Sequence, residues 1–227
     1  MANTAPTPRR PQLPELDAGL QLLTLEAGVT RALHALTVDH VLLEGGDACW
    51  IDPGTYAQSQ PVVDLASSER ILDRIRIARG FTPFQHLALL QQLPEFVTGR
   101  TELVVVPDLD GFYRNDDLLA DEGQEMLLTG VASLTRVARE HDVPVLLTRQ
   151  RADAFSEPIA TAATREIRCE STRFGPRFRT GDEDETLVYP VAGEYVQTTL
   201  SFWERVLAAR QPLYDSSPQE VMARGTN

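Results

Sequence analysis

Two aspartates stand where the sequence changes from an apolar run to a polar loop. Asp52 ends the run "ACWID", and Asp108 follows "ELVVVP". In phosphate chemistry, carboxylates at the carboxyl ends of parallel strands hold magnesium and help to position the ligand. The loop after a third apolar run, in "LQLLTLEAGVTR", adds Gly28, Thr30 and Arg31. These five residues form a candidate nucleotide site, because a short glycine loop between strand and helix is the layout of a phosphate-binding loop.

The loop lacks the residue on which phosphate binding most depends. A phosphate-binding loop reads G-x-x-x-x-G-K-[ST], whereas this loop is shorter and Val29 stands where the lysine belongs. The chain contains no lysine, since all 21 of its basic residues are arginine. Arg31 follows Thr30 and carries a charge, but a planar guanidinium differs in size and geometry from an ammonium group.

A second candidate site combines arginines with aromatic residues. The stretch "RFGPRFR" interleaves Arg173, Arg177 and Arg179 with Phe174 and Phe178. Arginines and aromatic rings together hold single-stranded nucleic acid by charge and stacking, so the three arginines are candidate nucleic-acid contacts. The competing interpretation is an ordinary hairpin with phenylalanines inward and arginines outward, and the alternation favours it.

No pattern in the chain predicts a metal site. The acidic stretch "DLDGFYRNDD" does not match the spacing of a calcium loop and is interpreted as a solvated loop. His86, on an expected helix, is interpreted as a packed or surface residue rather than a catalytic base. Cys49 and Cys169 are far apart in the sequence, which favours two buried free thiols.

The charge balance allows two interpretations. Asp and Glu total 33, and the formal net charge is -12. An acidic surface repels nucleic acid, but it also suits life at high salt, where the Debye length shrinks to about 3 Å and net charge says little about partners. The complete absence of lysine favours the high-salt interpretation. No apolar stretch fits a secretory signal or a membrane span, so we expect a soluble cytoplasmic protein without membrane contact.

Apolar strands and amphipathic helices alternate along the first two thirds of the chain. Strands are predicted at 20–26, 48–52, 74–79, 102–107 and 144–149, and the main helices at 29–44, 82–97, 123–142 and 198–210. This alternation is typical of a parallel sheet covered on both faces. After residue 165, segments of alternating apolar and polar residues are separated by turns, and we expect these segments to form antiparallel strands. The predicted organisation is a disordered segment 1–16, a core domain 17–211 and a flexible tail 212–227.

Several segments together resemble the ATPase core of the RecA/RadA recombinase superfamily, from about residue 18 to 200. They are "ACWIDPGTY", "RILDRIRIARGFTPFQHLALLQQL", "ELVVVPDLDGFYR", "LTRVAREHDVPVLLTRQ" and "STRFGPRF". The chain is also similar to small RadA-like proteins of halophilic archaea. The resemblance implies an α/β, three-layer RecA-like P-loop NTPase fold, with a central, mainly parallel sheet and a C-terminal antiparallel hairpin. It also implies a role in DNA recombination or repair.

The chain departs from the family at the residues that hydrolyse ATP. Val29 replaces the family's lysine, and no glutamate follows Asp52. Pro107 stands at the expected metal-holding acid, with Asp108 one residue late, and Arg149 replaces the asparagine after the next strand. Phosphoryl transfer depends on such positioning and charge neutralisation.

These departures predict a catalytically degenerate paralog, in which the five candidate nucleotide residues are a vestigial site. It would use no cofactor and act as an accessory through contacts with another copy, a RadA-type recombinase or DNA. One alternative is a nucleotide-binding or ATP-hydrolysing switch that uses ATP and magnesium. The other is a structural partner of an active recombinase with no DNA role.

Overall fold

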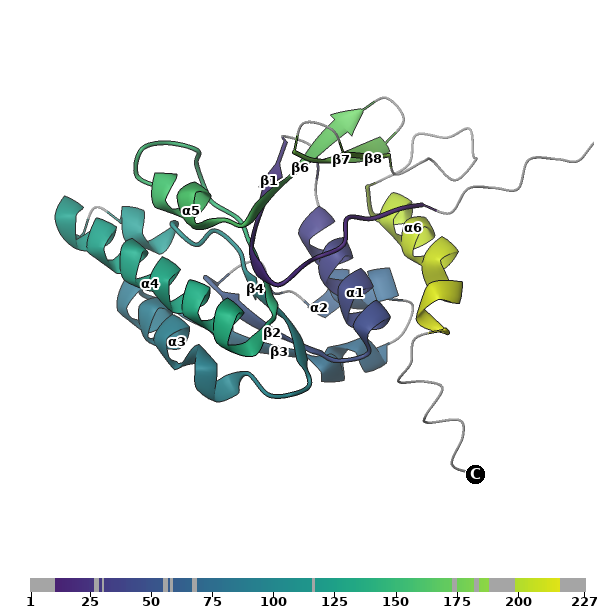
Figure 1. Cartoon of the computed structure of the whole chain (residues 1–227), viewed down its shortest axis with the longest axis horizontal. Coiled ribbons are helices and arrows are strands. Elements are labelled where there is room, and N and C mark those ends of the chain that lie inside the picture. Colours follow the sequence, from purple (N-terminus) through teal and green to yellow (C-terminus); the bar gives the residue numbers. More distant parts are fainter. Residues whose placement is uncertain are drawn as a thin grey trace, which may run out of the picture.

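The computed structural model describes most of the chain. The described residues are 11–26, 29, 31–54, 57, 59–66, 69–115, 117–172, 175–181, 184–187 and 199–216. Within them strands and helices alternate around one central sheet (Figure 1). The strands are β1 (Gly19–Leu25), β2 (Asp47–Asp52), β3 (Ile75–Arg79), β4 (Thr101–Val106), β5 (Pro144–Leu147), β6 (Arg165–Thr172), β7 (Gly175–Thr180) and β8 (Asp184–Leu187).

Six α-helices and two short 3-10 helices connect and cover the described strands. The α-helices are α1 (Ala32–Glu44), α2 (Ser59–Ala66), α3 (Pro83–Phe96), α4 (Ala120–His141), α5 (Glu157–Ala162) and α6 (Thr199–Tyr214). The 3-10 helices are η1 (Glu69–Arg74) and η2 (Phe112–Arg114). The five predicted strands and four predicted main helices are all present, with bounds that differ from the expected ones by a few residues.

The sheet is mainly parallel, as predicted. Its strand order is β3-β2-β4-β5-β1-β6-β7-β8, and the neighbours from β3 to β6 are all parallel. Strands β7 and β8 add an antiparallel edge. The expectation that β6 would be antiparallel to its neighbours is wrong on one side, because β6 pairs parallel with β1 before it pairs antiparallel with β7. The cause is helix α5, a crossover that the sequence analysis missed; a strand after such a crossover returns parallel.

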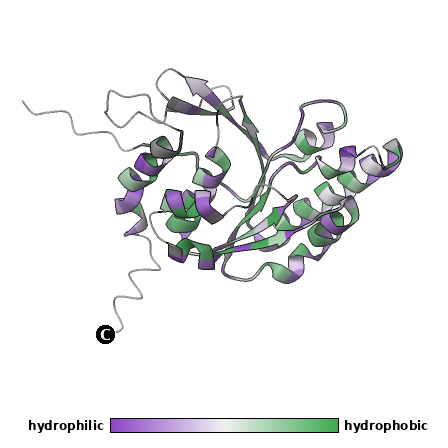
Figure 2. Cartoon of the chain, turned by 180° about the vertical axis from the view of Figure 1, so that it is seen from behind, coloured by the Kyte–Doolittle hydropathy of each residue, from purple (hydrophilic) through white to green (hydrophobic). Residues whose placement is uncertain are grey.

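Successive side chains of the inner strands enter two different hydrophobic cores. In β4, Leu103 and Val105 face one core while Val104 and Val106 face the other, and all four are fully buried. Helices α1, α2 and α6 cover the first core, and α3, α4 and α5 cover the second, so the molecule has three layers (Figure 1). Figure 2 shows the hydrophobic colour concentrated along the central strands and on the inward sides of the helices. Burial on both faces explains why these strands are continuously apolar.

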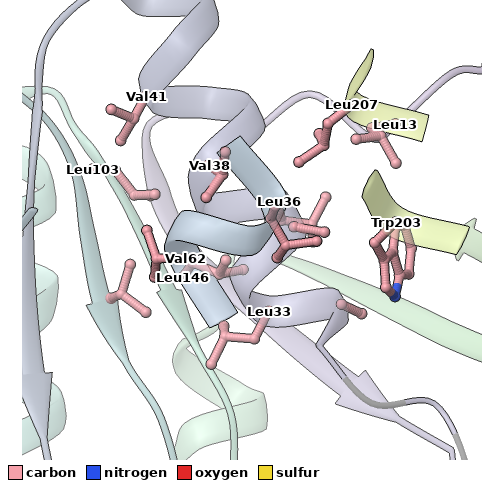
Figure 3. Close-up of a cluster of buried hydrophobic side chains, with 14 of the residues drawn as sticks. Leu13, Leu33, Leu36, Val38, Val41, Val62, Leu103, Leu146, Trp203 and Leu207 are labelled. Atoms are coloured by element: carbon pink, nitrogen blue, oxygen red, sulfur yellow. The ribbon is translucent and has the colours of Figure 1, made fainter. Parts of the chain in front are cut away.

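The C-terminal helix completes the first core. Trp203 of α6 is fully buried and packs its ring on Phe178 of β7 at 5.8 Å between centroids. Figure 3 shows Trp203 and Leu207 of α6 facing the side chains of α1, with Leu13 beside Leu207. The antiparallel edge of the sheet is therefore held against the α1 layer by α6.

Both ends of the expected core domain extend further than predicted. Leu13 and Leu16, assigned to a disordered segment, are buried in the first core. At the other end, α6 runs to Tyr214, inside the segment predicted as a flexible tail. The Tyr214 hydroxyl donates to Asp39 Oδ1 at 2.6 Å. Residues 1–10 and 217–227 lie outside the described residues.

One buried ion pair links these ends to α1. Arg210 of α6 donates to both carboxylate oxygens of Asp39, at 2.6 and 2.9 Å, and to the backbone oxygen of Pro11 at 3.0 Å. The side chains of Asp39 and Arg210 are only 5% and 8% exposed. Such a pair adds little stability over an apolar replacement, but loss of one partner leaves a buried charge without compensation.

We predict that Asp39→Ala lowers the free energy of unfolding by about 3–5 kcal/mol, because Arg210 then remains buried without a counter-charge. Urea unfolding with linear extrapolation measures the change. The matched control is Asp47→Ala, which removes an ion pair with the 71% exposed Arg100 and should cost at most about 1 kcal/mol. Equal losses in the two variants would contradict a special role for the buried pair.

Candidate functional site

The sheet topology opens a crevice where β1 and β5 lie side by side. The chain leaves β1 toward α1 on one face of the sheet, and it leaves β5 toward α5 on the other face. Ligands of open parallel sheets bind in the crevice outside the carboxyl ends of strands at such a switch point. The topology therefore places the candidate site at the ends of β1 and β5.

A cavity of about 800 Å³ lies at this switch point. Its lining comes from the end of β1, the start of α1 and the loops that follow β4 and β5. The polar and charged members include Thr24, Arg31, His34, Asp108, Thr148, Arg149, Gln150 and Arg151, and the apolar members include Leu23, Leu25, Val29, Leu33 and Pro61. This volume is in the range of sites that hold small organic ligands.

The predicted nucleotide residues are only partly brought together. Arg31 and Asp108 both line the cavity, whereas Asp52 is not part of its described lining. Gly28 and Thr30 lie outside the described residues. Arg149 and Arg151, which the sequence analysis did not select as ligand contacts, lie in the lining beside Arg31 and Asp108. Their signal in the sequence was an arginine pair directly after an apolar strand, in "VLLTRQR".

Helix α1 begins three residues later than predicted. It starts at Ala32, preceded by Arg31 in a left-handed conformation with φ of 68°. A non-glycine residue in this region is uncommon and strained. The helix has no side-chain cap and no acidic residue in its first turn. Leu33 and His34 of its first turn line the cavity.

Asp52 is committed to contacts within the protein. It is the last residue of β2 and is fully buried. Arg79, at the end of neighbouring β3, donates to Asp52 Oδ2 at 2.9 Å. The backbone N–H of Ala57 donates to Asp52 Oδ1 at 3.1 Å. The carboxylate therefore holds the loop after β2 against β3.

The acids that follow β4 are also tied to neighbouring groups. Asp108 has a positive φ of 43°, and its backbone N–H donates to the Thr148 hydroxyl at 2.8 Å. The same hydroxyl lies 3.3 Å from Asp108 Oδ1. The interpretation of the whole stretch as a solvated loop is wrong for Asp110, which is fully buried. Asp110 accepts bonds from Arg114 Nε and the Gln150 backbone N–H, both at 2.6 Å.

Arg114 extends this network to the loop after β5. Its two terminal nitrogens donate to Asp153 at 2.9 and 2.7 Å, and its guanidinium carbon lies 4.7 Å from the centre of the Phe155 ring. The hydrogen bonds from Arg114 lower the pKa of the Asp153 carboxyl to about 2. Together Asp110 and Arg114 join the loops after β4 and β5, which form one side of the cavity.

His86 of α3 is buried near the ends of β2 and β4. Its Nδ1 shares a 2.8 Å hydrogen bond with the Tyr113 hydroxyl, and its Nε2 has no hydrogen-bond partner among the described residues. Burial lowers the pKa of His86 to about 4, although the nearby Asp52 carboxylate opposes the shift. A neutral, packed histidine agrees with the interpretation of His86 as a structural residue.

The hairpin arginines are paired with acidic side chains. Arg177 of β7 donates to Glu170 of β6 at 2.7 Å, and Arg179 lies 3.7 Å from the same carboxylate. Phe178 between them points inward and is fully buried, as the hairpin interpretation predicts. Arg173 and Phe174 lie outside the described residues. Glu170 therefore offsets part of the positive charge expected at this surface.

No protein-family model and no curated protein matches the chain. The structure defines the class of the protein as α/β, with a mostly parallel sheet and an antiparallel C-terminal pair. Among the described residues, no group of three or more His, Cys, Asp or Glu side chains could hold a metal ion. None of the helices in the described ranges is long and apolar enough to cross a membrane.

We predict that protonation of His86 destabilises the fold at acid pH. Its pKa is about 4 in the folded chain against 6.5 for an ordinary histidine. The stabilisation from this site is therefore fully present above pH 6.5 and is lost as the pH falls toward 4, by about 3 kcal/mol in all. Urea unfolding at pH 7.5, 6.0 and 4.5 should show a smaller pH dependence in His86→Asn, which retains a partner for Tyr113. The same slope in both proteins would contradict the assignment.

Proposed function

We propose that the chain is a RecA/RadA-like protein that does not hydrolyse ATP and acts as an accessory or regulatory factor in DNA recombination or repair. The mainly parallel sheet between two layers of helices, and the cavity at its switch point, are compatible with this family's layout. The resemblance in sequence supplies the link to recombination. Because one fold serves many functions, that link carries less weight than the chemistry of the site.

The observation that carries the proposal is that the carboxylates at the carboxyl edge of the sheet are already bonded to neighbouring groups of the protein. Asp52 is paired with Arg79, Asp110 with Arg114, and Asp108 contacts Thr148. Phosphoryl transfer needs a metal ion held by such groups and a cation that neutralises the phosphates. With no lysine in the chain, and with Asp52 and Asp110 bound to arginines, this edge of the sheet is poorly equipped for hydrolysis.

Contacts with a protein partner are supported by exposed apolar side chains beside edge strand β3. Ile77 of β3 is 44% exposed, and Phe81 and Phe84, which follow, are 70% and 60% exposed. Large apolar side chains gathered at a sheet edge are typical of an interaction surface. The partner would be a second copy of the chain or a RadA-type recombinase.

The alternative function is a nucleotide-binding switch. The observation that favours it is the cavity, where Arg31, Arg149 and Arg151 supply positive charge in place of the missing lysine. Binding and hydrolysis make different demands, since binding needs charge and shape while hydrolysis also needs a positioned water and a held metal ion. A switch of this kind would bind nucleotide and still lack turnover.

We expect no release of phosphate from ATP above the rate without protein, with magnesium present and salt varied from low to molar concentration. The physical reason is the missing lysine together with the paired carboxylates at the strand ends. A colorimetric phosphate assay measures release, and circular dichroism confirms folding at each salt concentration. Magnesium-dependent release that is lost in Asp108→Asn would overturn the proposal and favour an ATP-hydrolysing switch.

We expect Glu170→Gln to bind a labelled single-stranded oligonucleotide more tightly than the wild type, with a steeper dependence on salt. The change removes a negative charge and releases Arg177 and Arg179 from their shared contact, which adds cations for phosphate contacts. Arg177→Gln with Arg179→Gln should weaken binding, and Glu140→Gln on α4 is the charge-matched control. Identical affinities in all four proteins would exclude the hairpin as a DNA contact and favour a purely structural partner.

A further inference from the structure

We propose that two copies of the chain pair through their β3 edge strands about a two-fold axis, which gives one continuous sheet across both copies. The inference rests on the proposed function in one respect, the use of the surface beside β3 for protein contacts. It goes further by naming a second copy of the chain as the partner and by giving the geometry of the contact. Four features of this edge support it.

The first feature is the direction of the backbone groups of β3. The strand stands at the end of the described sheet, where β2 is its neighbour. The Gly80 N–H, directly after the strand, donates to the Asp52 oxygen of β2 at 3.1 Å. Because backbone groups alternate along a strand, those of Ile75, Ile77 and Arg79 point the other way, into the open edge. They are placed to bond with another strand.

An antiparallel pair centred on Ile77 uses all of these groups. The two Ile77 residues would exchange both of their backbone hydrogen bonds, and Ile75 of each copy would do the same with Arg79 of the other. The two-fold axis then passes between the Ile77 residues, so each copy presents the same surface. Such a contact is self-complementary and closes at two copies, because it uses the β3 edge of both.

The second feature is the lack of charge on the surface beside the edge. Residues 80–94, "GFTPFQHLALLQQLP", contain no Asp, Glu or Arg in a chain of which 24% is charged. Phe81 and Phe84 are 70% and 60% exposed, and Gln85 and Ala88 are exposed as well. Two molecules of net charge -12 repel each other in general. This surface can meet its own copy without that repulsion, and the cores of interfaces are depleted in charged residues.

The third feature is the lack of protection along the strand itself. Ile77, at its centre, is 44% exposed. Arg76 donates to the Thr101 hydroxyl of β4 at 3.0 Å, and Arg79 donates to Asp52 of β2 at 2.9 Å. Edge strands that resist pairing carry prolines or free charges, whereas β3 contains no proline and both of its arginines are bonded to neighbouring strands of the same copy.

The fourth feature is the match of charges across the pair. In the register described, Arg79 of one copy lies opposite Ile75 of the other, and the exposed Asp73 stands two residues before Ile75. The Arg79 side chain is 39% exposed, although it is bonded to Asp52. Each end of the pair therefore brings a partly exposed arginine toward an exposed acid of the other copy, so the charges at the ends of the contact are complementary.

The mass of the full chain in solution tests the dimer. Sedimentation velocity and size-exclusion chromatography with light scattering are run over a wide range of protein concentration, at low and at molar salt. We expect a species of twice the chain mass of 25.2 kDa that gains population with concentration. No larger species should follow, because the two-fold contact leaves no second β3 edge for a third copy.

Two substitutions of exposed apolar residues separate the β3 edge from the rest of the surface. Ile77→Arg puts two like charges face to face on the axis and should raise the Kd of the dimer by about tenfold or more. Leu128→Arg is the matched control, because Leu128 of α4 is 48% exposed, close to the 44% of Ile77. It should leave the Kd unchanged. Circular dichroism and the Tm confirm that both variants are folded.

A mixture of two charge variants tests the two-fold geometry. Ile77→Arg and Ile77→Glu each set like charges opposite each other in a dimer of one variant, but opposite charges in a mixed dimer. Mixing them should restore dimers at concentrations where each variant alone is monomeric. A contact between two different surfaces does not place position 77 opposite itself, and it would show no such rescue.

A wild type that is monomeric at every concentration would overturn the proposal, as would a dimer that resists Ile77→Arg or a mass that rises beyond two copies. A mixture without rescue would overturn the two-fold register. The phosphate-release assay on the same samples reports on the proposed function separately. ATP hydrolysis by a dimer overturns that function and leaves the β3 pairing intact, whereas a monomer without hydrolysis leaves that function with a different protein as the partner.

Discussion

The central strands are buried on both faces, and the rest of the structure follows from this constraint. In β4, Leu103 and Val105 enter one core and Val104 and Val106 enter the other. No position in the middle of the strand is therefore open to solvent or ligand. Polar groups of the inner strands are therefore displaced to the strand ends, where backbone and side chains can still find partners. The carboxyl edge of the sheet collects Asp52, Asp108 and Asp110 for this reason, and Asp108 is the one of the three that lines the cavity at the switch point.

Ion pairs with arginine limit the chemistry of the buried acids Asp39, Asp52 and Asp110. Asp39, Asp52 and Asp110 are each bound by an arginine whose fork also reaches other groups of the protein or packs against a ring. Each pair avoids an isolated buried charge. Arg210 and Arg79 reach acids 171 and 27 positions away, whereas Arg114 lies four residues from Asp110. The same contacts occupy the carboxylate oxygens that metal chemistry would use. Stability at the strand ends and hydrolytic chemistry at the same ends thus compete for the same atoms.

Charge is distributed unevenly between the surface and the cavity. The chain as a whole is strongly acidic, and the hairpin arginines Arg177 and Arg179 share Glu170 as a counter-charge. The arginines of the cavity wall face one aspartate instead. Within the described lining of the cavity, positive side chains therefore outnumber negative ones, in contrast to the chain as a whole.

The sequence by itself determined where the strands and main helices lie, because apolar runs bounded by glycine, proline and aspartate are local signals. It also predicted the inward side of Phe178 from strand alternation. Tertiary structure decided the parallel return of β6, the burial of Asp110 and the convergence of Arg31 with Arg149. It decided as well the pairing of Asp39 with a residue 171 positions away. Periodicity records only which side of an element is apolar, whereas these contacts depend on which elements become neighbours once both cores close, and that choice is made by long-range packing.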